Sequence, residues 1–356
     1  MVGLHSSDPV TVFLAARARV TGLTVEDVED ALYERRSLLR MLGMRRTMFV
    51  QTEAVAEVMD AACTRALGPP QRRALIKLLE NGGVTDDGAT WIDRVSAEVL
   101  ASLSTRGEAT ARELTEDVPE LAHKISYAAG KSYAGLIGVS TRILFLLATE
   151  SHVVRARPRG SWLSSQYRWA LTRDWIGRVF PKREAAEARA DLARLWLTAY
   201  GPGTTTDLKW WTGWGVRDTR AALETVDAVE VDLDDGTGWI LPGDLDTDPP
   251  PPWVGLLPSL DPTTMGWKER EWYLGSHRDQ LFDVNGNAGP TVWVNGRVVG
   301  GWAIRKDGTV AWRALEDIGT EKTSLIDAEA GRLELWLGDV RPTPRFRTPI
   351  DRELSI

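Results

Sequence analysis

The sequence contains one cysteine, Cys63, so it has neither an internal disulfide nor a cysteine metal cluster. It has no signal peptide and no apolar run long enough to span a bilayer, and we expect a cytoplasmic, nucleoid-associated protein. His123, His152 and His277 show no metal-ligand spacing with one another or with carboxylates. No glycine-rich phosphate loop occurs either. We therefore predict no metal and no cofactor.

Positive charge is scarce in the chain as a whole but concentrated in one part of it. The formal net charge is −7, with 43 basic and 50 acidic residues. Between residues 121 and 183 there are 11 lysines and arginines against two acids, Glu150 and Asp174, which gives +9. A global acidic balance argues against non-specific nucleic-acid binding, whereas a local basic patch is typical of a nucleic-acid footprint. The alternative is a solvated hairpin in a protein–protein module.

That basic segment has the pattern of a winged helix-turn-helix. Residues 108–114 and 139–149 carry apolar residues at helical spacing, and Ser140 or Thr141 is expected to cap the second helix. Two predicted strands, 153–157 and 161–171, flank a Pro-Arg-Gly turn and form a wing. Such a module places a helix and a hairpin on a duplex, so we expect double-stranded DNA as the partner.

Basic side chains on this module and on an earlier hairpin are the candidate DNA contacts. Arg155, Arg157 and Arg159 alternate along one strand, so they share a face and form a phosphate track. Arg45 and Arg46 lie on a predicted turn, where phosphate contact and simple solvation are equally open. The predicted DNA-binding residues are Arg45, Arg46, Lys124, Lys131, Arg142, Arg155, Arg157, Arg159 and Arg168.

The remaining patterns predict an α+β chain of tandem winged helix-turn-helix modules followed by a small antiparallel β-barrel. The expected domains are an N-terminal winged-helix-like domain (1–69), a central winged helix with a basic wing (70–183), a third winged helix (184–248) and a barrel-like domain (253–356). Asn295-Gly296 signals a hairpin in the last of these. We also expect a helix over 53–67 that stops at Gly68-Pro69-Pro70, and a strand over 333–337.

Several segments, taken together, resemble the winged-helix DNA glycosylases of the AlkZ and YcaQ type. They are GLHSSDP at 3–9 with TVFLAARARV at 11–20, LLRMLGMRRTMFV at 38–50, RGSWLSSQYRWA at 159–170, LLPSLDP at 256–262 and NGNAGPTVWVNGRVVGGW at 285–302. Their order and spacing span nearly the whole chain. The resemblance implies tandem winged helices with a C-terminal β-barrel, and excision of alkylated or cross-linked purines from DNA.

The resemblance also points to a catalytic loop at residues 4–8. Characterised members have Gln–apolar–Gln or Gln–apolar–Asp in this loop, and the first and last motif positions fall here on His5 and Ser7. A helical segment normally precedes the loop, so we expect Met1 to be a truncated or misassigned start. The candidate catalytic residues are His5, Ser7 and Asp8. His5 would hold or deprotonate a water, Ser7 would add a hydrogen bond, and Asp8 would orient His5 or stabilise a sugar cation.

Two alternatives stay open at this stage. Ser7-Asp8-Pro9 also matches a helix N-cap followed by proline in the first turn, which explains those residues without chemistry. Asp261 in LLPSLDP fits a turn or cap better than a catalytic acid. The function is accordingly either a DNA glycosylase or a non-catalytic DNA-binding protein. We see no heptad seam and expect a monomer.

Overall fold

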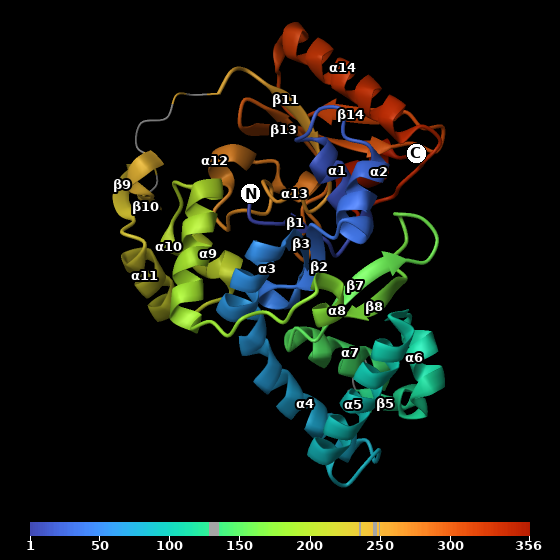
Figure 1. The fold of residues 1–356 in the computed structure, drawn as a ribbon. Helices are drawn as coiled ribbons and strands as arrows, with labels where there is room; N and C mark the ends of the chain where they lie inside the picture. The colour runs from blue at the N-terminus through green and yellow to red at the C-terminus, as the bar shows by residue number, and fades with distance from the viewer. Residues whose placement is uncertain (128–134, 235, 245–247, 249) are drawn as a thin grey trace. The chain divides into compact units, whose positions relative to one another are not determined.

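The computed structural model describes residues 1–127, 135–234, 236–244, 248 and 250–356 (Figure 1). Internal contacts divide the chain into two compact units. The split unit consists of Met1–Glu29 and Ala193–Ile356, and the central unit is Asp30–Leu192. The four domains expected from the sequence divide the chain more finely than these two units do, and they stay a prediction.

The central unit combines helices with short antiparallel strands. Its helices are α3 (Glu53–Met59), α4 (Gly68–Asn81), α5 (Gly88–Arg106), α6 (Ala111–Asp117), α7 (Val139–Thr149) and α8 (Thr172–Ile176), with π or 3-10 turns at Asp30–Glu34, Met44–Arg46, Asp60–Thr64, Arg65–Leu67 and Pro119–Ala122. Its strands are β2 (Leu38–Leu42), β3 (Met48–Thr52), β4 (Glu108–Ala109), β5 (Lys124–Tyr127), β6 (Gly135–Gly138), β7 (Val153–Pro158) and β8 (Tyr167–Leu171).

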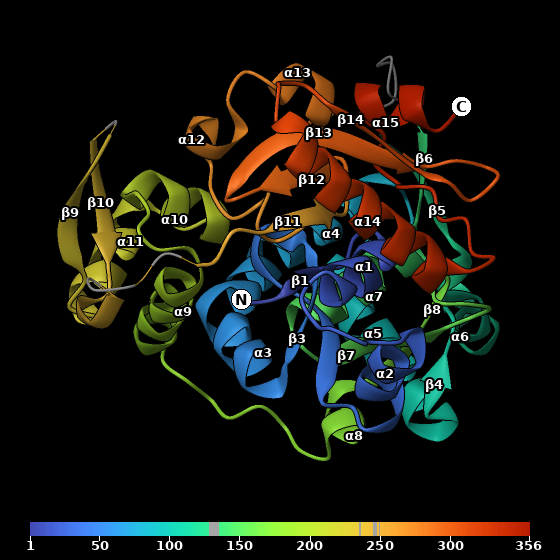
Figure 2. The ribbon, with the colours of Figure 1, turned by 90° about the horizontal axis from the view of Figure 1, so that it is seen from above.

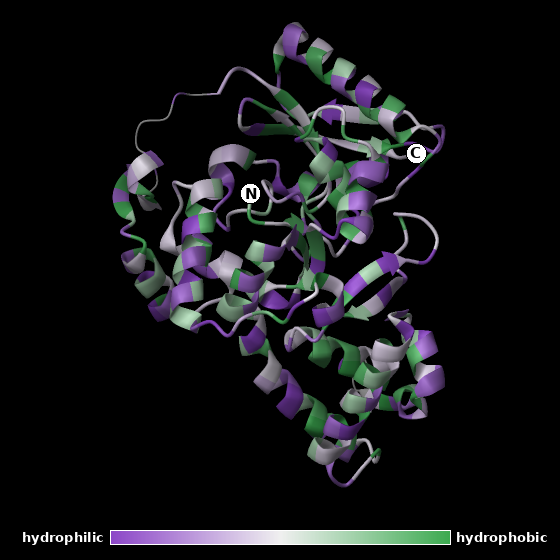
Figure 3. Cartoon of the chain, in the orientation of Figure 1, coloured by the Kyte–Doolittle hydropathy of each residue, from purple (hydrophilic) through white to green (hydrophobic). Residues whose placement is uncertain are grey.

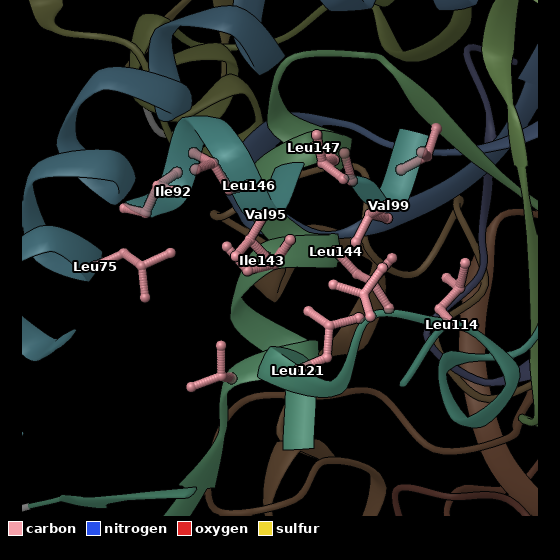
Figure 4. Packing of buried hydrophobic residues seen from close by; sticks show 14 of the residues in the cluster. Leu75, Ile92, Val95, Val99, Leu114, Leu121, Ile143, Leu144, Leu146 and Leu147 are labelled. Atoms are coloured by element: carbon pink, nitrogen blue, oxygen red, sulfur yellow. The ribbon is translucent and has the colours of Figure 1, made fainter. Parts of the chain in front are cut away.

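The core of this unit lies where α4, α5, α6 and α7 converge (Figure 4). The predicted helix 139–149 is confirmed as α7, and Figure 3 shows it as mostly hydrophobic. Val139, Ile143, Leu146 and Leu147 are all buried, as their helical spacing predicts. The antiparallel sheet β4-β8-β7 completes the module, and the elements follow one another along the chain as α5, β4, α6, the hairpin β5–β6, α7, β7 and β8.

Three local predictions in this module are wrong. Glu108 and Ala109 pair with β8 as strand β4, and the helix starts only at Ala111 because Thr110 caps it. The N-cap of α7 is Gly138, and no side chain caps it. The second wing strand begins at Tyr167 rather than at 161, because residues 161–166 belong to the connection between the two strands.

The helix predicted to stop at Gly68 continues instead. Gly68 has helical dihedrals, and Pro69 and Pro70 occupy the first turn of α4. Prolines are tolerated in a first turn because amide groups there have no partner within the helix. The π and 3-10 turns at Asp60–Thr64 and Arg65–Leu67 separate α3 from α4 and so create this new first turn.

The segment between α6 and α7 contains an antiparallel hairpin. Strands β5 and β6 pair with Lys124 opposite Gly138 and Tyr127 opposite Gly135. The predicted contact Lys131 lies outside the described residues.

The split unit contains the N-terminal helices and everything after the middle of α9. Its helices are α1 (Pro9–Arg17), α2 (Val25–Glu29), α9 (Ala185–Tyr200, which crosses the boundary), α10 (Thr205–Thr212), α11 (Val216–Thr225), α12 (Glu271–Leu274), α13 (Arg278–Leu281), α14 (Gly319–Leu337) and α15 (Pro349–Leu354), with a 3-10 turn at Pro242–Asp244. Its strands are β1 (Leu4–His5), β9 (Val229–Leu233), β10 (Gly236–Ile240), β11 (Val254–Leu257), β12 (Thr291–Val294), β13 (Arg297–Ile304) and β14 (Val310–Ala314).

The last four strands form an open sheet in the order β11-β12-β13-β14, so the predicted barrel is wrong. Helix α14 packs on β11 and β14, whereas α12 and α15 pack on β13 (Figure 2). The predicted hairpin is confirmed: Asn295 and Gly296 join β12 to β13 with φ of 50° and 84°. A two-residue turn needs this left-handed pair, and glycine adopts it without strain.

No helix among the described residues is long and apolar enough to cross a membrane.

Candidate functional site

The loop Leu4–Asp8 is anchored to the first helix through its last residue. Asp8 is the N-cap of α1: its Oδ1 accepts a hydrogen bond from the Val10 backbone N–H at 3.2 Å, and Pro9 follows in the first turn. Its Oδ2 accepts one from the backbone N–H of Arg345 at 2.8 Å. The capping alternative is thus confirmed for Asp8, and both of its oxygens bind backbone groups.

Asp8 is one of the more deeply buried carboxyl groups of the split unit, with 3% of the residue exposed. Burial raises the pKa of Asp8, because it penalises the charged form. The N–H groups of Arg345 and Val10 and the positive charge of Arg345 act in the opposite direction and only partly offset burial. A substitution here therefore changes both the cap and the charge of the loop.

The same loop brings His5 and Ser7 together. The Ser7 backbone N–H donates to Nδ1 of His5 at 3.4 Å, a long hydrogen bond, and both residues are half-buried. Ser6, between them, is buried. A ring nitrogen that accepts a hydrogen bond carries no proton, so the neutral imidazole has its proton on Nε2.

Three segments that carry the family resemblance pack against one another in the split unit. The Thr11 hydroxyl on α1 donates to the Ser259 carbonyl at 2.7 Å, and the Ser259 hydroxyl donates to the Ala288 carbonyl at 2.9 Å. A small pocket of about 20 Å³ opens beside these contacts and is lined by Asp8, Thr11, Ser259, Trp302 and several prolines. The loop at 4–8 thus has a defined neighbourhood built from distant parts of the sequence.

Asp261 has the structural role that its sequence context predicts. Its Oδ1 accepts the Thr263 backbone N–H at 2.9 Å, which makes a turn, and its carboxylate pairs with Arg19 on the segment after α1. The Asp261 side chain has no exposed surface. This geometry confirms a turn residue.

The three arginines of the predicted phosphate track have different surroundings. The guanidinium of Arg155 lies 5.2 Å from the ring centre of Tyr167 and 5.0 Å from that of Trp169. Arg157 lies over the Tyr33 ring at 4.6 Å and donates to Glu34 at 2.8 Å. Arg159, beyond the register shift, is exposed. Because Glu34 already neutralises Arg157, Arg159 is the better placed of the two for an external phosphate.

The other predicted basic contacts are scattered over the central unit. Lys124 is exposed on β5, and Arg142 is half-buried in a pocket that α7 shares with α4, with its Nε buried and lacking a hydrogen-bond partner among the described residues. Arg168 lies near Glu113: the N–H and hydroxyl of Thr110 lower the pKa of that carboxyl, and the charge of Arg168 adds to this effect. Of these two arginines, Arg168 has an acidic neighbour within the protein.

Arg45 and Arg46 are exposed in the turn between β2 and β3. Both have left-handed backbone, with φ of 50° and 61°, which is uncommon for side-chain-bearing residues. The turn is held by the Gly43 N–H, which donates to the Thr47 carbonyl at 2.8 Å. Two adjacent arginines are thereby fixed at the tip of a hairpin.

The sequence reasoning missed Arg40 and Arg345. Arg40 is buried on β2 with its guanidinium 4.7 Å from the Tyr167 ring, and its signal was an arginine within the apolar run LLRML. The backbone of Arg345 holds Asp8 from 337 residues away, and no local pattern marks it. In the part of the chain that the structure describes, no group of three or more His, Cys, Asp or Glu is placed to hold a metal ion.

Comparisons with known proteins identify a family and a similar fold. The family model described as "DNA glycosylase AlkZ-like" matches residues 1–336. No curated protein matches the chain. Among solved structures, Streptomyces sahachiroi DNA glycosylase AlkZ is similar at 21% identity, over 96% of this chain and 90% of that chain, with a TM-score of 0.73. At this identity the structural likeness shows a shared fold.

Proposed function

The chain belongs to the AlkZ-like DNA glycosylase family, and from this premise we propose that it hydrolyses the N-glycosidic bond of alkylated or cross-linked purines in double-stranded DNA. The observation that carries the proposal is the family match over residues 1–336, which includes the loop Leu4–Asp8 and the helix that Asp8 caps. No metal or cofactor enters the proposed reaction.

The proposed chemistry needs a positioned water more than a strong base. The bond between C1′ of the sugar and the purine nitrogen breaks with its electron pair going to the purine, whose positive charge from alkylation is thereby neutralised. Water adds to C1′ of the oxocarbenium-like sugar and releases a proton to solvent. A cationic leaving group departs readily, so orientation of the water dominates the barrier.

In this scheme His5 and Ser7 hold the water. The Nε2–H of His5 donates to the water oxygen, and the Ser7 hydroxyl accepts one of its hydrogens. Asp8 is a positioning residue: its bonds to the backbones of Val10 and Arg345 fix the loop. In its ionised form the carboxylate favours the developing sugar cation.

For DNA binding we propose that the module α5, β4, α6, α7, β7 and β8 acts as a winged helix-turn-helix. The order of its elements and the sheet order β4-β8-β7 support this proposal. So does the charge of +9 over residues 121–183. In this arrangement α7 is the recognition helix, and the exposed Arg159 on the wing contacts phosphate.

The test is base release from a duplex that contains 7-methylguanine and from a duplex with a purine cross-link. We expect release by the full chain and a loss of about 100-fold in the His5→Ala variant, the lower range for a positioned proton-donating or accepting group. His5→Gln, which keeps a donor and an acceptor, serves as the matched variant and should retain most activity. Release by His5→Ala at the wild-type rate would remove His5 from the mechanism.

The second candidate function is DNA binding without catalysis. Its basis is the loop itself, where His5 and Ser7 stand at the two positions that the resemblance assigns to glutamine. Salt-dependent binding of both duplexes without base release would favour this alternative.

A further inference from the structure

A groove on the central unit has no role in the proposed reaction. It lies between α7, the start of α6 and the β7–β8 hairpin, and its volume is about 510 Å³. Phe145, Tyr167 and Trp169 supply aromatic wall, and Arg112, Arg155 and Arg159 supply positive charge. Among the described residues that line it, none is acidic. The groove therefore combines aromatic surface with charge of one sign.

The positive charge next to the aromatic wall is held in place. Arg155 pairs with Trp169 across the β7–β8 ladder, so the two side chains lie on the same face of the sheet. Its guanidinium is 5.0 Å from the Trp169 ring centre and 5.2 Å from that of Tyr167, within cation–π range. Trp169 and Phe145 are only half-buried, so part of each ring is accessible.

The outer part of the groove is polar and exposed. Arg112 at the start of α6, Arg159 on the wing and Gln166 beside it are exposed. Thr141, on the first turn of α7, is exposed on the same side and also lines the groove. Arg112 and Arg159 thus flank an opening with an aromatic wall. Arg112 also pairs with Glu116 on α6 at 3.1 Å, and both of these side chains are exposed to solvent.

This combination matches a nucleotide better than simpler ligands. Bases stack on aromatic rings whatever their sequence, and arginines neutralise the attached phosphate. A free phosphate has no use for the aromatic wall, and an apolar ligand has none for three arginines. The volume of the groove lies within the range of small-molecule sites. It is larger than contact with the edge of one paired base requires.

We propose that this groove binds one unpaired nucleotide of the DNA, with its base against Trp169 and Phe145 and its phosphate between Arg112 and Arg159. The proposal rests on the proposed function, because it takes α7 and the wing as the DNA-binding face. It adds that the protein recognises DNA in which a nucleotide has left the stack, as happens at a bulge or a distorted lesion site.

The experiment compares two duplexes that differ only in whether one 2-aminopurine nucleotide is bulged or paired. We expect the full chain to bind the bulged duplex about tenfold more tightly, from the typical stacking contribution of one base. Trp169→Ala should abolish this preference, measured as the ratio of the variant's affinities for the bulged and the paired duplex. Trp169→Phe, which keeps a ring and guards against misfolding, should retain most of it.

Trp272 provides the matched control, because it is a largely exposed tryptophan of the split unit. Trp272→Ala should leave the preference intact. Equal affinity of the wild type for the two duplexes, or a preference that survives in Trp169→Ala, would overturn the inference and leave the proposed function standing. Failure to bind either duplex would overturn the proposed function, and this inference with it.

Discussion

Arg19 donates a hydrogen bond to each carboxylate oxygen of Asp261, at 2.8 Å to Oδ2 and 2.6 Å to Oδ1. The two residues are 242 positions apart, and they tie the end of the first helix to the segment LLPSLDP. The carboxylate has no exposed surface, whereas the arginine side chain keeps 24% of its own. Arg19 is thus the principal counter-charge of a fully buried acid.

Removing Arg19 alone should lower the free energy of unfolding more than removing the charges of both Arg19 and Asp261. Arg19→Ala leaves a buried carboxylate that keeps the hydrogen bond from the Thr263 N–H, and breaking a buried pair in this way costs about 3–5 kcal/mol. Adding Asp261→Asn removes the uncompensated charge and should recover part of that loss. Chemical denaturation of the two variants measures this. A double variant no more stable than Arg19→Ala would contradict the argument.

Asp8 should make the stability of the protein depend on pH in one direction. Its pKa is raised in the folded state, so above the ordinary value of 3.8 the unfolded chain has lost the proton while the folded chain still holds it. The unfolded state then binds fewer protons, and the free energy of unfolding falls as the pH rises, until the pH passes the folded-state pKa.

Asp8→Asn removes the titration. Its amide oxygen can accept only one of the two backbone N–H groups that Asp8 binds, but that loss does not depend on pH. We expect the stability of the wild type relative to Asp8→Asn to decrease as the pH rises through this window and then to level off. Urea unfolding from pH 3.5 upward gives both curves. A difference that is constant over the series would mean that Asp8 titrates alike in the folded and unfolded states.

Restoring the glutamine pattern of the family should strengthen base release. His5→Gln with Ser7→Gln places at both motif positions an amide that donates and accepts hydrogen bonds. We expect faster release of 7-methylguanine than in the wild type, with unchanged affinity for the duplex. Ser6→Gln is not a suitable control, since Ser6 is buried, so a single Ser7→Gln variant serves for comparison. If the double variant released base more slowly than the wild type, His5 and Ser7 would already work as a pair that differs from the two glutamines.

Arg157 and Arg159 should differ in their contribution to DNA binding. Arg159→Ala removes an exposed cation and should reduce the slope of log affinity against log salt by about 0.9, the value for one phosphate contact. Arg157→Ala should change the slope much less, because Glu34 already pairs with this arginine. Glu34→Gln should release Arg157 and steepen the slope. Titrations at several salt concentrations separate these outcomes, and identical slopes for the two alanine variants would count against the assignment.

Local patterns predicted the elements whose cause is local. The helix 139–149 was predicted because its buried residues recur at helical spacing, and the Asn295-Gly296 turn because few residues adopt two consecutive left-handed conformations. The strand predicted at 333–337 is wrong, because these residues belong to helix α14. Leucines at 333, 335 and 337 alternate, but Leu335 is 86% exposed on α14, while Ile326, Ala330, Leu333 and Leu337 form its buried stripe.

The features that the sequence did not predict depend on contacts between residues far apart in the chain. Whether β11 and β14 close a barrel depends on pairing between strands that are not neighbours in sequence, and the sheet is open. The cap at Asp8 was predictable from Ser-Asp-Pro, but its second bond, to Arg345, was not. Likewise Arg157 fitted a phosphate track by its alternation, and only the fold shows that Glu34 neutralises it.

The split unit also has a consequence for the order in which the protein acquires its structure. During synthesis, residues 1–29 emerge first, yet their partners in the unit begin at Ala193, with Asp261 and Arg345 later still. The central unit is continuous in sequence and has its partners at hand much sooner. The loop with His5 and Ser7, although made first, therefore reaches its final surroundings among the last parts of the chain, since contacts at such separation form slowly. Nascent chains halted before the segment 256–262 should contain a folded central unit and an unfinished candidate site.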